Sequence, residues 1–400
     1  MRPVLVLIFH PAAPPDAGPL VRALAGARRS LAERQRVAFL AAGADEVKVV
    51  AGPPDGLSFG ERLGAEVRAW AAARGARAAE AGGGGPGGVV VLGSGSIPLA
   101  RAADLRRFVE VAAGPGGHAL ANNRYSADVV AVSRAADLAE LPPLPADNAL
   151  PRWLEERAGV AVADLRSRWR LGVDIDTPLD LLILGAGGAG TGSGRAGRGG
   201  TGTGAFHGTA PLVGERLAAL SEVLTDRRAE LLVAGRVSAT TLRWLESGVA
   251  CRVRALVEER GLRAASRLAQ TGATTGSRPP RSVLGELLDR DGPESLARTV
   301  AMLADAAVID TRVLLAHRHG AEESAWPPAE DRFASDLLLP ASIADPWLRA
   351  LTASAAGLSP IAAPDIAATS PSDRPILLGG HTLMNGGLRL LAQRARAGAR

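Results

Sequence analysis

Residues 173–181 place three acids and a Thr-Pro pair in one short run, Val173-Asp174-Ile175-Asp176-Thr177-Pro178-Leu179-Asp180-Leu181. The alternation of apolar and acidic residues predicts a short strand end with both carboxylates on one face. Thr177 is a residue type that caps helices, and Asp180 follows where the helix dipole favours negative charge. Carboxylates in this setting suit a divalent cation that carries phosphates. The alternative is an ordinary strand-to-helix junction whose acids only cap the helix and contact solvent.

The residues before this run alternate between apolar strand patterns and helical patterns. We expect strands at 4–9, 46–50 and 89–92, and helices at 19–42, 59–78 and 102–113. Such alternation indicates a mostly parallel sheet covered by helices, and ligands of such sheets bind beyond the carboxyl ends of the strands. That rule selects candidate nucleotide- or substrate-binding residues at two strand ends and metal ligands at a third: Gly93, Ser94, Gly95 and Ser96; Asn122, Asn123 and Arg124; Asp174 and Asp176.

The turn at 122–126 offers amide groups and a guanidinium that can hold a phosphate. The alternative is a simple hairpin turn, because Asn tolerates left-handed backbone.

The segment from Asp174 to Leu181 resembles the D-x-D-T-P-x-D-L segment of small nucleotidyltransferases, the family of the molybdenum cofactor and 2-phospho-lactate guanylyltransferases. Residues 89–99, followed by Ala103-Asp104-Leu105, are similar to the central strand and metal-site turn of that family. The resemblance covers residues 1–184. It implies an α/β domain of the glycosyltransferase-A type that transfers a nucleotidyl group from a nucleoside triphosphate with Mg²⁺, with Asp174 and Asp176 as metal ligands.

Three features depart from the family pattern. The loop after the first strand contains Pro11, Pro14 and Pro15 in place of glycines, and prolines lack the N–H groups that cradle phosphate. The family's signature lysine is also absent, since Lys48 is the sole lysine and lies in an expected strand. Ser96 occupies the position of a metal-binding Asp, and a hydroxyl is a weaker magnesium ligand than a carboxylate.

Composition limits the other classes of function. The chain has 47% hydrophobic residues and a formal net charge of +5 over 400 residues, without a cluster of basic and aromatic residues that would indicate nucleic-acid binding. The single cysteine, Cys251, excludes an internal disulfide and a cysteine zinc site. No apolar run reaches membrane-spanning length, and the N-terminus begins as a strand, so we expect a cytoplasmic protein. The oligomeric state is left open.

We expect two domains, at 1–184 and 205–400, joined by a flexible Gly-rich linker at 185–204. The second part also alternates between strand and helix patterns, which predicts a second α/β domain. Its expected strand ends carry a candidate anion site built from Arg236, Arg312, Gly379, Gly380 and His381.

A metal site from His317, His319 and Asp310 or Asp331 requires that a strand continue through both histidines. The alternative is a polar loop with solvated histidines.

Three functions follow from these observations. The first is a divergent, magnesium-dependent nucleotidyltransferase that uses a phosphorylated small-molecule acceptor. The second is a catalytically degenerate protein that binds a nucleotide or phosphorylated metabolite without turnover. The third places the chemistry in the second domain.

Overall fold

The computed structural model describes residues 2–52, 56–81, 87–144, 147–185, 211–259, 279–358 and 374–398. It is an α/β structure that divides into two compact units. The first is mainly Ala25–Asp174 together with Met1–Pro15, and the second is mainly Ile175–Leu262 and Thr274–Arg400, together with Asp16–Leu24. The division between Asp174 and Ile175 groups helix α6 (Pro178–Gly185), which the sequence assigns to the first domain, with the second unit. Most of the expected linker, 186–204, lies outside the described residues.

The first unit contains a six-stranded sheet in the order β2-β1-β3-β5-β4-β6. Its strands are β1 (Val4–Pro11), β2 (Glu46–Gly52), β3 (Gly88–Gly93), β4 (His118–Ala121), β5 (Val129–Val132) and β6 (Ala161–Asp164). Only β5 runs antiparallel to its neighbours. The strands expected at 4–9, 46–50 and 89–92 are therefore present as β1, β2 and β3, each with slightly wider bounds.

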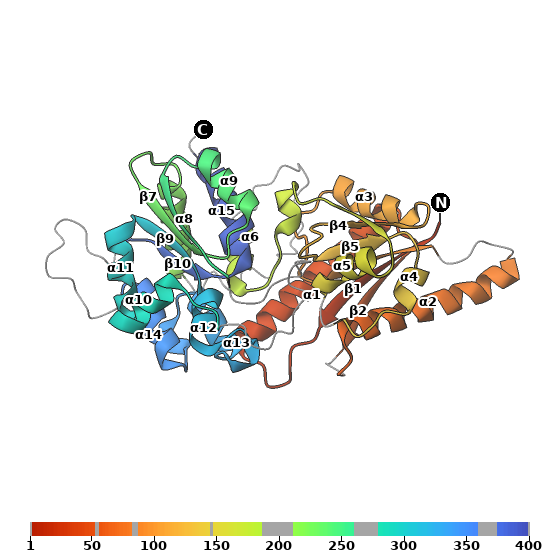
Figure 1. Ribbon diagram of the computed structural model, residues 1–400, viewed down its shortest axis with the longest axis horizontal. Helices are drawn as coiled ribbons and strands as arrows, with labels where there is room; N and C mark the ends of the chain where they lie inside the picture. The colour runs from red at the N-terminus through yellow and green to blue at the C-terminus, as the bar shows by residue number, and fades with distance from the viewer. Residues whose placement is uncertain are drawn as a thin grey trace. The chain divides into compact units, whose positions relative to one another are not determined.

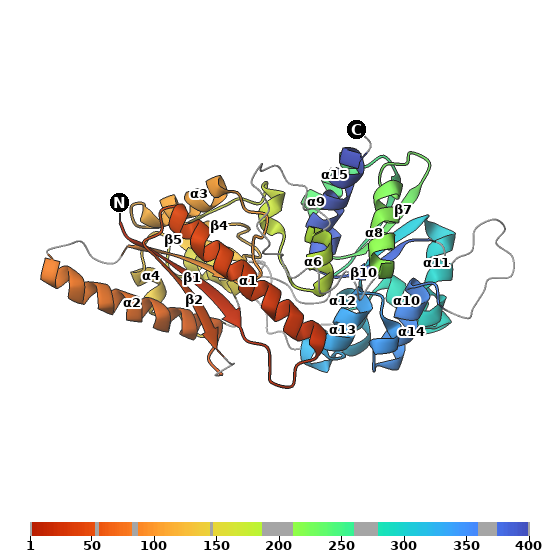
Figure 2. The same ribbon diagram turned by 180° about the vertical axis from the view of Figure 1, so that it is seen from behind.

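Helices cover both faces of this sheet. β1 is apolar at successive positions, so Leu5 and Leu7 lie on one face, and Val4, Val6 and Ile8 lie on the other. Both faces are therefore apolar and have to be buried. The first face packs against α2 (Phe59–Ala81), α4 (Ala136–Ala139) and α5 (Leu150–Glu156). The second packs against α1 (Pro19–Ala41) and α3 (Ala102–Ala113), and α1 crosses in front of the sheet in Figure 2.

The second unit contains a four-stranded, wholly parallel sheet in the order β10-β9-β7-β8. The strands are β7 (Glu230–Gly235), β8 (Arg252–Val257), β9 (Ala306–Asp310) and β10 (Ile376–Gly379). β7, β9 and β10 are almost fully buried, as a parallel sheet covered on both faces requires.

Helices flank this second sheet. In Figures 1 and 2, α9 (Ala239–Gly248) and α15 (Leu388–Gly398) lie on one side of the sheet. On the other side lie α10 (Val283–Asp291), α11 (Leu296–Leu303) and α14 (Pro346–Ala355). The remaining helices of the unit are α8 (Pro211–Val223), α12 (Thr311–His319) and α13 (Ala329–Asp336).

None of the helices in the described part of the chain has the length and apolar composition needed to cross a lipid bilayer.

The run at 173–176 differs from its expected form, because it holds a single antiparallel bridge between Asp174 and Ser96 in place of a strand. The helical half of the prediction is confirmed. α6 begins at Pro178, and the Asp180 carboxylate accepts hydrogen bonds from the backbone N–H groups of Asp176 at 2.9 Å and Thr177 at 2.7 Å. These bonds satisfy amide groups that the helix start would otherwise leave unpaired.

Candidate functional site

In the first unit, polar side chains meet at the carboxyl ends of β1 and β3. Nδ1 of His10 lies 3.0 Å from Oγ of Ser94, and both side chains are buried. Ser96 pairs with Asp174 through the β-bridge, and Gln35 of α1 donates to the Ser96 carbonyl. Gly93 ends β3, and Gly95 lies in the turn that follows it. The candidates from Gly93 to Ser96 therefore form one segment, which pairs with Asp174 at Ser96.

Two arginines of α1, Arg28 and Arg29, act on His10 through their charge. Burial lowers the pKa of His10, and the charges of Arg29 and Arg28 lower this pKa further. All three effects favour the neutral imidazole. Arg28 is partly exposed and Arg29 is exposed on α1. The sequence pattern alone gives no reason to select either residue.

The polar turn after β4 is occupied by contacts within the first unit. Asn122 donates to Asp128 and to the Leu171 carbonyl, and its own carbonyl accepts from the backbone N–H groups of Asp128 and Val129. Asn123 accepts from the backbone N–H of Tyr125. These bonds hold the turn in shape, although neither asparagine takes the left-handed backbone on which the hairpin interpretation is based.

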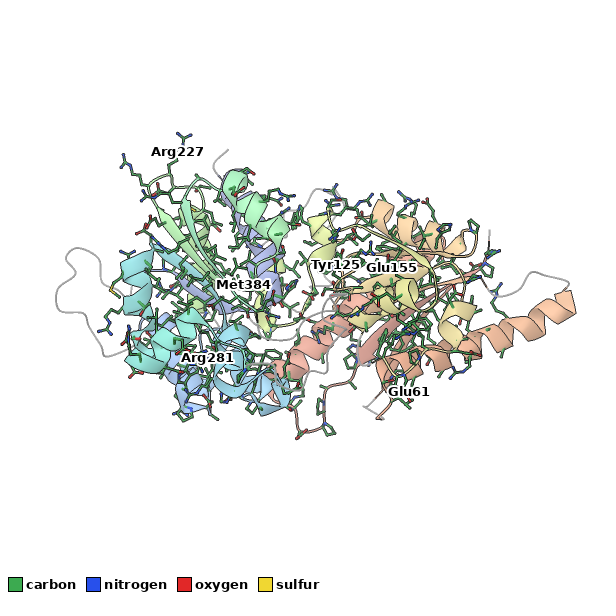
Figure 3. All side chains as sticks on the ribbon, in the orientation of Figure 1. Glu61, Tyr125, Glu155, Arg227, Arg281 and Met384 are labelled. Carbon is green, nitrogen blue, oxygen red and sulfur yellow. The ribbon has the colours of Figure 1, made fainter. Side chains whose placement is uncertain are left out.

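Arg124 pairs with Glu155 and lies 5.5 Å from the Tyr125 ring. Tyr125 and Glu155 are both labelled in Figure 3. A phosphate at Arg124 would have to compete with the Glu155 carboxylate.

The two carboxylates expected to hold magnesium fall in different units, Asp174 in the first and Asp176 in the second. Among the described residues, no group of three or more His, Cys, Asp or Glu side chains is arranged to hold a metal ion.

In the second unit, the carboxyl edge of the parallel sheet opens into a pocket of about 290 Å³. We call it the β7–β9 pocket, and its lining residues are Asp176, Thr177, Arg236, Arg312, Glu323, Arg332, Phe333, Gly380 and His381. Arg236 follows β7, Arg312 lies just beyond β9, and Gly380 and His381 follow β10. The structure thus brings together four of the five residues of the sequence-derived anion site. Gly379 does not line the pocket; a Cβ there would meet Leu383 at 2.6 Å and Leu179 at 3.0 Å.

A buried ion network supports two of the pocket's arginines. Nε and Nη2 of Arg236 donate to the Asp310 carboxylate at 2.6 and 3.3 Å. Arg312 binds Asp336 through both terminal nitrogens, and its Nη1 also donates to Thr311 Oγ1 at 2.8 Å. Asp310 and Asp336 are fully buried. Burial opposes the Arg312 cation, but the carboxylates around it, Asp336 first and then Asp310 and Asp180, together raise the pKa of Arg312.

The proposed metal pair His317 and His319 is wrong in its structural premise. The strand ends at Asp310, which caps α12 by accepting from the Arg312 N–H at 3.0 Å, so both histidines lie on a helix. His317 is a structural residue, because its Nδ1 accepts from the Ser282 N–H and its Nε2 lies 3.0 Å from Asp289.

Gly235 allows β7 and β9 to approach closely at the pocket. Its φ is +134°, and a Cβ would lie 2.3 Å from the Asp310 Cβ. We expect Gly235→Ala to lower the free energy of unfolding by about 1–3 kcal/mol or more, through backbone strain and displacement of Asp310. Gly214→Ala is the control, since a Cβ there meets nothing within 4 Å and alanine favours the helix. Urea denaturation of both variants checks this, and equal stabilities would contradict the role given to Gly235.

Comparisons of this chain with protein-family models, with curated proteins and with solved structures return no match.

Proposed function

We propose that this protein is a divergent nucleotidyltransferase of the glycosyltransferase-A type. Its nucleoside triphosphate and Mg²⁺ bind at the carboxyl ends of β1 and β3 in the first unit. The acceptor oxygen of a phosphorylated small molecule attacks the α-phosphorus, and pyrophosphate leaves. The observation that carries this proposal is the bridge between Ser96 and Asp174, which pairs the two segments that resemble the metal-binding parts of that family.

The charges around this edge are compatible with a magnesium–triphosphate complex. Mg²⁺ bound to nucleotides commonly takes one or two carboxylates and fills its other positions with phosphate oxygens and water. Asp174 supplies one carboxylate, and the Ser96 hydroxyl belongs to the adjacent chain segment. Arg28 and Arg29, whose charges reach His10, supply the positive charge that the proline-containing loop and the absent lysine do not.

The alternative function is nucleotide binding without turnover. The substitution of a hydroxyl at Ser96 for the family's carboxylate favours it, because a weaker metal site stabilises the charge that develops on the phosphates less well.

The first test compares Asp174→Asn and Arg29→Ala with the native chain in calorimetric titrations of nucleoside triphosphates, with and without Mg²⁺. We expect Asp174→Asn to remove the magnesium-dependent part of the affinity. Arg29→Ala should weaken binding roughly 10- to 100-fold, because a hydrogen bond to a charged group contributes about 1.5–3 kcal/mol.

Arg36→Ala is the matched control, since Arg36 lies on the same helix but pairs with Glu33 at 2.9 Å. Magnesium-dependent binding that survives Asp174→Asn contradicts the site. If a nucleoside triphosphate binds but none of a panel of phosphorylated acceptors leads to release of pyrophosphate, the result supports the alternative function, nucleotide binding without turnover.

A further inference from the structure

The β7–β9 pocket lies where the order of the second sheet reverses direction. The chain passes from β7 outward to β8, then returns across β7 to β9 and continues to β10 on the other side. At such a reversal the connections leave the two central strands in opposite directions, which opens a crevice at their carboxyl ends where ligands of parallel sheets bind. Arg236 directly follows β7, and Arg312 lies in the first turn of α12, directly after β9.

The pocket holds three guanidinium groups, and two of them have fixed positions. Arg236 and Arg312 are each held by two hydrogen bonds to a buried carboxylate, so their head groups are oriented before any ligand arrives. Arg332 lies 3.3 Å from Glu323, and its Nε is buried without a hydrogen-bond partner in the described part of the chain. A guanidinium has five N–H donors, so the carboxylate contacts leave donors for a ligand.

His381 presents a defined tautomer to the pocket. Asn385 accepts from the Ser238 N–H at 2.9 Å and donates to the His381 carbonyl at 3.0 Å, and these two partners fix the orientation of its amide. The amide nitrogen also lies 3.2 Å from His381 Nδ1 and 3.4 Å from the Arg236 carbonyl, and because it can only donate, Nδ1 faces it as an acceptor. The neutral imidazole then carries its proton on Nε2, where it acts as a hydrogen-bond donor.

Asn385 belongs to a π-helical turn, Leu383–Gly387, which directly follows His381 and Thr382. Such turns are rare and are frequent at functional sites. Met384 of this turn, labelled in Figure 3, is fully buried, so the turn is anchored in the core of the unit.

The paired acidic and basic side chains of the pocket limit the kinds of ligand that it can bind. Asp310 and Asp336 offset Arg236 and Arg312, and Glu323 offsets Arg332, while Asp176 adds a further acid. A ligand that is anionic throughout would therefore meet carboxylates as well as arginines. A ligand with one compact anionic end and several hydroxyl donors would satisfy both kinds of group.

The size of the cavity favours a small ligand. Its volume of about 290 Å³ lies just below the range of small-molecule sites, which span roughly 300–1,000 Å³. Phe333 is the one aromatic ring among the lining residues apart from the His381 imidazole, which gives a nucleobase no pair of large rings to stack between.

We propose that the β7–β9 pocket binds a small phosphorylated polyol. Arg236, Arg312, Arg332 and His381 Nε2 hold the phosphate, and Asp176, Thr177 and Glu323 accept hydrogen bonds from the hydroxyls. A phosphate suits this donor set better than a carboxylate, because three terminal oxygens accept more of the fixed N–H groups than two. The residues of this site belong to the second unit, whereas those of the proposed nucleotide site belong to the first.

The test uses the full chain and glycerol 3-phosphate as the probe, with inorganic phosphate, glycerol and serine as comparison compounds, in calorimetric titrations. We expect glycerol 3-phosphate to bind more tightly than inorganic phosphate, and glycerol and serine to show no saturable binding. His381→Ala and Arg332→Ala should each weaken binding of the probe about 10-fold or more, since each removes one charge-assisted or preoriented donor.

Two controls separate this site from the first unit and from misfolding. Arg290→Ala removes an exposed arginine that pairs with Asp291, and it should leave the affinity unchanged. Arg29→Ala should also leave it unchanged, although it weakens triphosphate binding in the first unit. Arg332→Lys keeps the charge and should recover part of the affinity.

Three results would overturn the proposal: no saturable binding of glycerol 3-phosphate at millimolar concentration, binding that Arg29→Ala abolishes but the pocket variants do not, or preferential binding of serine. The last result would assign the pocket to a zwitterion, with an ammonium group on Asp176 and Glu323.

Discussion

Asp336→Ala is expected to lower the free energy of unfolding of the second unit by about 3–5 kcal/mol, the cost of removing one partner of a buried ion pair. Asp336 is fully buried and accepts two hydrogen bonds from Arg312, whose side chain is 9% exposed. Without this carboxylate, the Arg312 cation keeps the cost of its burial and loses its main partner. Asp310 cannot replace it, because its carboxylate already accepts from Arg236 and from the backbone N–H of Arg312.

Hydrogen exchange of the β9 amides under native conditions measures this effect within the second unit. The control is Asp291→Ala, which breaks an exposed pair with Arg290 and should change stability by less than about 1 kcal/mol. The double variant Arg312→Met with Asp336→Leu removes both charges, so we expect it to be more stable than Asp336→Ala. A single variant as stable as the native chain, or a double variant less stable than the single one, would contradict a paired, buried network.

Most of the strand framework is predictable from the sequence because its strands are short apolar runs bounded by Gly, Pro or polar residues. β3 and β9 are of this kind, and both are buried. The strand expected at 173–176 fails because its single partner is Ser96, so no ladder can extend along it. The strand that a His317–His319 metal site would have required does not continue past Asp310, because the Asp310 side chain caps α12 immediately after β9 and a local cap outweighs the apolar pattern of 313–316.

For the candidate sites too, the sequence predicts residues that directly follow a strand, but it does not predict contacts between residues far apart in the chain. The rule that ligands bind beyond parallel strands finds Arg236, Arg312, Gly380 and His381, because each closely follows its strand. It cannot find the partners that orient them, since Asp336 and Asn385 come from other elements. Asp176 is found, but for a metal site with Asp174, whereas the structure groups it with the arginines of the β7–β9 pocket.

Asp180 should make the stability of this protein fall as pH rises from about 4 to about 7. Burial, followed by the charge of Asp176, raises the pKa of Asp180 from 3.8 to about 7, although backbone hydrogen bonds from Thr177 and Asp176 oppose the shift. In this window the folded chain holds a proton on Asp180 that the unfolded chain has released. The stabilisation is therefore complete below the unfolded pKa and is lost as pH rises through the folded pKa, with a slope of at most about 1.4 kcal/mol per pH unit.

Asp180→Asn isolates this contribution from every other titrating group. The asparagine carbonyl can still accept from the Thr177 or Asp176 N–H, so the variant resembles the protonated acid at all pH values. Urea denaturation of both proteins between pH 4 and 9 gives the difference in their free energies of unfolding. We expect the native chain to lose stability relative to the variant as pH rises to about 7, by on the order of a few kcal/mol, and the difference to level off above it. A difference that is constant or in which the native chain gains stability with pH would mean that the two backbone hydrogen bonds outweigh burial. Asp180 would then be an ordinary charged helix cap, and the Asp176–Thr177 side of the β7–β9 pocket would carry a second negative charge.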